Sequence, residues 1–218
     1  MTCADMKDSS DDSFTMTIQI QATFDLINVL SPFVTFEKIP PQRRLYYTVD
    51  GVKMCYLIRS GLIKVRRDTD EFVMTTLPTP NIAGITDMVP DTSGVYLELQ
   101  TEGEIATLTT ARAQQLIAET NSWELLAKHI TKVTTNLFNN NIIMTAPTTY
   151  EVVKFHLIML MREPDSVRET TSAVKYILER TRLSRSTVMK MLAQLKQGGY
   201  IKLEDGILVT LNHLPARY

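Results

Sequence analysis

Side chains able to make specific polar contacts gather in one stretch near the C-terminus, residues 184–197, which reads SRSTVMKMLAQLKQ. Its first seven positions hold hydroxyl and cationic groups, namely Ser184, Arg185, Ser186, Thr187 and Lys190. Arg and Lys can donate to guanine O6 and N7, and Ser and Thr can meet phosphates or bases. The set therefore predicts nucleic-acid binding rather than catalysis.

The same stretch predicts the helix that would carry these groups. Ser184 is a favoured N-cap, and Gly198-Gly199 is a strong stop. Between them the apolar residues recur on one face: Val188, Met191, Leu192 and Leu195. The polar groups consequently occupy the other face, concentrated at the N-terminal end.

Neighbouring segments complete a known DNA-binding motif. A helix through about Arg180, capped by Thr171 or Ser172, comes before the turn 181–183. After the glycines, residues 200–203 and 207–211 flank an Asp-Gly turn, which is a strong hairpin signal. Two short helices with a tight turn and then a hairpin form a winged helix-turn-helix.

This motif predicts how the chain meets a duplex. The second helix enters the major groove, and its N-terminal residues reach base edges. Thr171, Lys175 and Lys202 are expected to contact phosphates, which positions a domain without reading sequence. The alternative is an ordinary solvated helix face, as in a protein-interaction module that does not bind DNA.

Charge is distributed unevenly along the 218 residues. Residues 148–218 carry 11 Lys and Arg against 7 Asp and Glu, whereas residues 1–147 carry 12 against 17. The C-terminal part is therefore basic within a chain of net charge −1, which favours a polyanion partner there.

Other chemistries find little support. Cys3 and Cys55 form no C-x-x-C pair, and the three histidines show no metal spacing, so we expect no metal and no other cofactor. Cys55 is either a buried structural thiol or an oxidant sensor. No nucleophile–base pair or phosphate loop stands out, so we expect no enzyme. With neither a signal peptide nor a membrane span, the expected location is the cytoplasm.

The N-terminal two thirds predict a β-rich domain between helices. An acidic leader, residues 1–13, is followed by a short helix through 21–30 and then by short strands with turns between them, which indicate a small antiparallel barrel. The strands are expected at residues 33–36, 54–58, 62–65, 72–74, 95–99 and 105–108.

Helices resume at Thr109-Thr110, with one helix over 111–119 and a longer one over about 122–143. The longer helix has an apolar stripe that packs either on its own barrel or on a second chain: Leu126, Ile130, Val133 and Leu137. We expect a homodimer through this stripe. Another helix, 149–162, ends at Pro164. The predicted domains are 14–120, 121–145 and 146–218.

Several motifs together resemble the Crp/Fnr superfamily of bacterial regulators. TRLSRSTVMKMLAQLKQGGYI (181–201) is similar to its DNA-binding domain, and VKFHLIMLMREPD (153–165) to the first helix of that domain. EGEIATLTTARAQQLI (103–118) resembles its last barrel strand and following helix, and YLIRSGLIKV (56–65) its barrel hairpin. The resemblance spans nearly all of 30–215, with the inhibitor of hydrogen peroxide resistance as the nearest subgroup.

This resemblance implies an α+β chain with a cyclic-nucleotide-binding-like β-barrel, a long dimerisation helix and a C-terminal winged helix-turn-helix that reads a palindrome. Arg185 and Lys190 fall on DNA-contacting family positions, whereas Ser186 replaces the family's glutamate, so a different operator is expected. Arg182 replaces a turn glycine.

The sensor also departs from the cyclic-AMP-binding members. Their Gly-Glu turn reads Ala83-Gly84-Ile85-Thr86 here, and their Arg-Ser region lies near Ser93-Gly94. Without a cation a buried phosphate is costly, so cyclic AMP is not expected to bind.

The sequence thus predicts a homodimeric, cyclic-AMP-independent transcription regulator of stress or peroxide response, with double-stranded DNA as partner and RNA polymerase as a further candidate. The rival predictions are a cyclic-nucleotide-dependent activator and a protein-interaction module.

Overall fold

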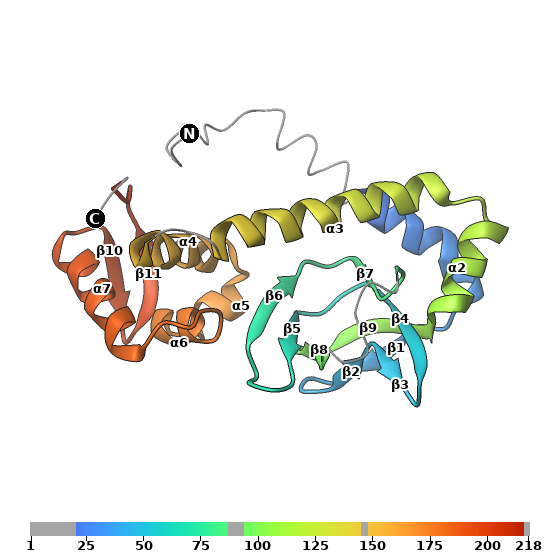
Figure 1. Ribbon diagram of the computed structural model, residues 1–218, viewed down its shortest axis with the longest axis horizontal. Helices are drawn as coiled ribbons and strands as arrows, with labels where there is room; N and C mark the ends of the chain where they lie inside the picture. Colours follow the sequence, from blue (N-terminus) through green and yellow to red (C-terminus); the bar gives the residue numbers. More distant parts are fainter. Residues whose placement is uncertain (1–20, 87–93, 145–147, 216–218) are drawn as a thin grey trace. The chain divides into compact units, whose positions relative to one another are not determined.

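The computed structural model describes residues 21–86, 94–144 and 148–215. The chain divides into two compact units, one within residues 8–136 and the other within residues 137–218, and the boundary falls inside α3 (Trp123–Met144). Figure 1 shows that the first unit is rich in strands and the second in helices. The leader expected at residues 1–13 lies outside the described residues.

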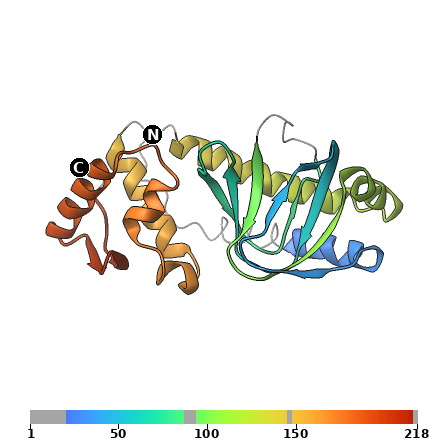
Figure 2. The ribbon, with the colours of Figure 1, turned by 90° about the horizontal axis from the view of Figure 1, so that it is seen from below.

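The first unit is built on two antiparallel sheets that share a core. One has the order β1 (Glu37–Ile39), β9 (Gly103–Thr109), β4 (Val52–Ile58), β3 (Thr48–Val49), with β7 (Asn81–Ala83) paired to β4. The other has the order β2 (Arg44–Tyr46), β8 (Val95–Leu99), β5 (Ile63–Arg67), β6 (Val73–Leu77). Ile58, Ile63, Leu97 and Ile105 belong to one buried cluster, so the sheets face each other (Figure 2).

The strand expected at residues 33–36 is wrong. That run begins with a 3₁₀ turn, η2 (Ser31–Phe33), and the strand starts only at Glu37, which pairs with Ile105. Pro32 stands in the first turn of η2, where its fixed φ suits a helical turn and its missing N–H costs nothing. The apolar run is therefore a connection out of helix 21–30 rather than a strand.

The hairpin expected at residues 56–65 is also wrong. Tyr56 to Ile58 lie in β4 and pair with β9, whereas Ile63 to Val65 lie in β5 and pair with β8. The intervening residues carry the chain from one sheet to the other. No residue with a side chain fits at position 61, because the φ of Gly61 is +112° and an added Cβ would lie 2.9 Å from Gly103 Cα.

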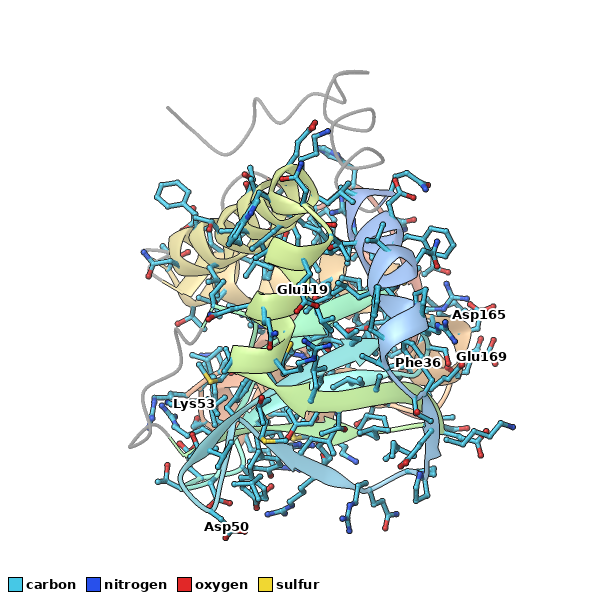
Figure 3. All side chains as sticks on the ribbon, turned by 90° about the vertical axis from the view of Figure 1, so that its right-hand side faces the viewer. Phe36, Asp50, Lys53, Glu119, Asp165 and Glu169 are labelled. Carbon is cyan, nitrogen blue, oxygen red and sulfur yellow. The ribbon has the colours of Figure 1, made fainter. Side chains whose placement is uncertain are left out.

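Three helices close one side of this unit. Helix 21–30, α2 (Thr110–Glu119) and the start of α3 share a buried cluster that includes Ile27, Leu57, Leu116 and Leu126. The predicted threonine cap is confirmed, because the Thr109 side chain accepts a hydrogen bond from Arg112 N. Figure 3 looks onto the two shorter helices.

A polar anchor fixes helix 21–30 to the sheets. The guanidinium of Arg59 lies 3.6 Å from the Phe36 ring centroid and donates to Ser31 Oγ over 3.0 Å. Phe36 is labelled close to the helix in Figure 3. This anchor holds the helix in place at the end from which η2 leaves.

The second unit is a three-helix core with a hairpin. It contains α4 (Thr149–Arg162), the short α5 (Asp165–Arg168), α6 (Ala173–Leu178), α7 (Arg185–Gln197), β10 (Ile201–Glu204) and β11 (Ile207–Leu211). The core joins all the longer elements through Leu157, Ile177, Leu192 and Leu208. Ser172, rather than Thr171, caps α6 by accepting from Lys175 N. The predicted winged helix-turn-helix is confirmed, and α5 is an addition that the sequence did not reveal.

Candidate nucleic-acid interface

The orientation of α7 is set by its buried face. Val188 and Leu195 are fully buried and Leu192 is 2% exposed, all within the core of the second unit. Burying each such side chain contributes about 1.5–3 kcal/mol, so rotation of α7 about its axis would be costly. Arg185, Ser186 and Lys190 stand on the opposite side and are exposed, as the sequence predicted.

A hydroxyl cluster stands at the N-terminus of α7. Ser184 Oγ accepts from Thr187 N over 3.2 Å and lies 2.9 Å from Ser186 Oγ and 2.8 Å from Thr187 Oγ1. The Ser184 hydroxyl is thus engaged as the helix cap, while Ser186 and Thr187 are held beside it. The positive end of the helix dipole lies here as well, which favours an approaching phosphate.

The predicted cations differ in what they already bind. Within the described part of the chain, neither Arg185 nor Lys190 forms an ion pair. Lys175 Nζ lies 3.9 Å from Glu179 Oε1, and Lys202 Nζ lies 2.7 Å from Glu204 Oε1. The bond to Glu204 raises the pKa of exposed Lys202 and keeps it charged. Of these four predicted cations, Arg185 and Lys190 can therefore bind a duplex without first breaking an ion pair with a carboxylate.

The hairpin is attached to the helix-turn-helix at its turn. Asp205 and Gly206 both have positive φ, 47° and 84°, which is the conformation of a type I′ turn. Ala173 N donates to Gly206 O over 2.9 Å, so the turn rests on the N-terminus of α6. Thr171, just before this contact, is half-buried.

A buried polar cluster holds α4 against α6. Tyr176 Oη donates to Glu163 Oε1 over 2.8 Å, and Arg180 Nη2 lies 3.9 Å from the same oxygen. The Arg180 guanidinium also stacks 3.7 Å from the Tyr176 ring centroid. Because Glu163 and Arg180 side chains are only 11% and 8% exposed, this pair positions the helix that precedes α7.

Sequence reasoning missed Met189. It stands outside the predicted set of DNA-contacting residues, yet its side chain is 51% exposed. Apolar side chains on a recognition helix can contact the methyl group of thymine. Its position four residues after Arg185 is the signal that could have found it, because residues four apart are neighbours on the same face of a helix.

The expected dimerisation residues divide into two groups. Leu126 is 9% exposed and belongs to the core of its own unit, and Ile130 packs against that core. Val133 is half-buried, whereas Leu137 is 51% exposed. The stripe therefore packs on the core of its own unit at the Leu126 end and is exposed at the Leu137 end.

The oxidant-sensing alternative for Cys55 has little support. Cys55 is fully buried in β4, and burial raises the pKa of its thiol to about 12, which removes the reactive thiolate. Cys3 lies outside the described residues. Among residues 21–86, 94–144 and 148–215 no group of three potential metal ligands occurs, and no described helix is long and apolar enough to cross a membrane.

Comparison with known sequences supports the interface. A family model described as winged helix-turn-helix DNA binding matches residues 149–216. The inhibitor of hydrogen peroxide resistance of Escherichia coli K12 is 28% identical over 171 residues, covering 75% of this chain and 79% of the relative. The protein of that name from Salmonella typhimurium is 26% identical over the same share of each chain.

Solved structures extend the similarity to both units. The c-di-GMP-responsive global regulator CLP of Xanthomonas campestris has a TM-score of 0.68 at 15% identity, covering 87% of this chain and 99% of that one. A CooA mutant from Carboxydothermus hydrogenoformans has 0.63 at 15%, covering 86% and 91%. A protein described as a transcriptional regulator of the Crp/Fnr family from Eubacterium rectale has 0.57 at 14%, covering 86% and 90%.

The chain has the fold of a Crp/Fnr-type regulator. The expected resemblance is confirmed, and with it the α+β class with a cyclic-nucleotide-binding-like first unit. The matched family model supports DNA binding by the second unit.

Proposed function

We propose that this protein is a homodimeric transcription regulator that reads a palindromic operator with α7. Base edges would be contacted by Arg185, Ser186 and Lys190, and phosphates by the remaining predicted residues: Ser184, Thr187, Thr171, Lys175 and Lys202. Such a role belongs in the compartment that holds the DNA, in agreement with the cytoplasmic expectation.

One observation carries this proposal. The N-terminal end of α7 presents two cations without carboxylate partners among the described residues, next to a hydroxyl cluster, on a helix fixed by three buried side chains. Because the helix and the hydroxyl cluster are already ordered, binding would cost mainly the ordering of the two cationic side chains.

The test begins with a duplex selected in vitro from a random pool by the purified wild-type chain. Replacing Arg185 and Lys190 together with alanine is expected to weaken binding by about 30-fold or more, since each of the two base contacts contributes about 1–3 kcal/mol. Fluorescence anisotropy measures the Kd. Lys196→Ala is the matched control, because Lys196 is an exposed cation at the other end of α7.

The control should stay within about twofold of wild type, because it alters only the long-range field. Equal binding by the double variant would overturn the role of α7 and favour the protein-interaction module instead.

The homodimer is proposed from the uncovered part of α3. Trp123 and Leu137 are fourteen residues, or two heptads, apart, so they lie on one face of the helix, and they are 54% and 51% exposed. Leu137→Asp is expected to convert a dimer to a monomer in analytical ultracentrifugation, because it would bury an unpaired charge. Met74→Asp, at an equally exposed apolar position on β6, should leave the dimer intact. A monomeric wild type would contradict the proposal.

Independence from cyclic AMP is proposed from the described turn after β7. Ala83 at the end of β7 and Ile85 in the turn are buried, and neither supplies a cation for a phosphate. Isothermal calorimetry with cyclic AMP should give no heat of binding, and measurable heat would favour the cyclic-nucleotide-dependent activator.

A role in peroxide response is suggested by the names of the relatives. Genome-wide mapping of bound DNA with and without peroxide tests it, and identical occupancy would contradict it. Transcription in vitro with RNA polymerase tests whether the polymerase is a partner.

A further inference from the structure

An apolar side chain lies on the face that α7 turns to solvent. Among residues 148–215, Met189 and Val209 are the most exposed large apolar side chains, at 51% and 44%. Met191, two residues after Met189, packs against the core of the second unit, whereas Met189 does not belong to that core. The Met189 side chain is therefore available to a partner of α7.

The spacing along α7 places Met189 directly behind the cationic tip. Arg185 stands four residues before it and Ala193 four residues after it, and all three residues are exposed. Residues four apart are neighbours on the same face of a helix. The exposed side of α7 thus carries a row that begins with a cation and continues with two apolar side chains.

The chemistry of this row indicates what Met189 can contact in a major groove. A thioether has no hydrogen to donate and is only a weak acceptor, so Met189 cannot bind phosphates or polar base edges as Arg185 can. The apolar group that bases present in the major groove is the C5 methyl of thymine. A flexible and polarisable methionine side chain can adapt its shape to such a group.

We propose that Met189 is a specificity-determining residue that contacts the C5 methyl group of a thymine in each half-site of the operator. This inference rests on the proposed function, and it adds an apolar contact to the hydrogen bonds of Arg185 and Lys190. Four residues of helix advance by about 6 Å, and successive base pairs by about 3.4 Å. The thymine is therefore expected within about two base pairs of the base that Arg185 contacts.

The test compares thymine with uracil, because uracil lacks only the C5 methyl group and keeps the hydrogen-bonding groups of thymine. In the duplex selected by the wild-type chain, each thymine of a half-site is replaced in turn by uracil, together with its symmetry mate. At one position the wild-type Kd, measured by fluorescence anisotropy, should rise about 10-fold, because two methyl contacts disappear from the dimeric complex. Base-pair substitutions compared between wild type and Arg185→Ala locate the base that Arg185 contacts.

Variants of α7 assign the methyl contact to Met189. Met189→Ala keeps a strong helix former at this position, so α7 should stay intact. It should bind the thymine duplex about 10-fold more weakly than wild type and respond less than about twofold to uracil. Met189→Leu should retain most of the preference for thymine, because it restores an apolar side chain of similar size.

Val209→Ala is the matched control. It removes the other exposed apolar side chain of this unit, from β11 rather than from α7, and should keep the wild-type response to uracil.

Equal wild-type Kd values for thymine and uracil at every position would overturn the role of Met189 while leaving DNA binding by α7 in place, and this scan needs no variant to fold. A uracil response of wild-type size in Met189→Ala would also overturn it, because another residue would then contact the methyl group. Failure of the wild-type chain to select any duplex would instead contradict the proposed function, and this inference with it.

Discussion

At the residue scale, the proposed reading of DNA depends on which polar groups are already engaged. Ser184 is occupied as a cap, and Lys175 and Lys202 have carboxylate neighbours, so the eight predicted residues are not equivalent. Arg185 and Lys190 are therefore the residues whose contacts with a duplex would contribute most to the binding free energy. Sequence could place all eight on the right elements, but it could not show these engagements, because ion pairs with Glu179 and Glu204 depend on side-chain geometry.

Because His129 is buried, we expect the free energy of unfolding to depend on pH. Its pKa is lowered from 6.5 to about 4 in the folded chain, so the unfolded chain binds the proton more tightly. The neutral His129 imidazole therefore contributes about 3 kcal/mol to the free energy of unfolding. This contribution is fully present above pH 6.5 and is lost as the pH falls from 6.5 to 4. His129→Gln should flatten this part of a urea-denaturation profile.

His156, whose pKa burial also lowers, keeps a residual slope in that variant. An unchanged profile in His129→Gln would show that the imidazole is not buried in its neutral form.

At the scale of elements, the winged helix was predictable because each signal is local. Ser184, the paired glycines and the Asp-Gly turn fix helix start, helix stop and hairpin within a few residues of themselves. The strand missed at β7 is only three residues long, and its pairing with β4 joins segments far apart in sequence. Likewise, the burial of His129 depends on Thr23, 106 residues away, so no local pattern reveals it.

The cluster behind α6 gives a prediction at this scale. Glu163→Ala would remove one of the carboxylates beside buried Arg180 and the acceptor of Tyr176 Oη. We expect the free energy of unfolding of the second unit to fall by about 2–4 kcal/mol, measured by hydrogen exchange in α6 and α7. Glu169→Ala, at an exposed position in the same unit, should change it by less than about 0.5 kcal/mol. Equal losses of unfolding free energy in the two variants would show that the Glu163 cluster does not stabilise the second unit.

At the scale of the whole molecule, two compact units meet within a single helix. The basic excess lies in the unit that carries α7, and the acidic excess in the unit with the sheets. The proposed dimer seam lies on α3, the element through which the chain passes from one unit to the other. Any signal bound in the first unit would therefore have a continuous helix leading toward the DNA-binding unit.

The most direct measurement of the central claim is the affinity of the wild-type chain for its selected duplex as a function of salt, with the stoichiometry determined in parallel. The account predicts two chains per duplex and a Kd that rises about 100-fold between 50 and 200 mM salt, as expected when at least four phosphates are neutralised. A chain that selects no duplex, or whose binding does not respond to salt, would contradict it.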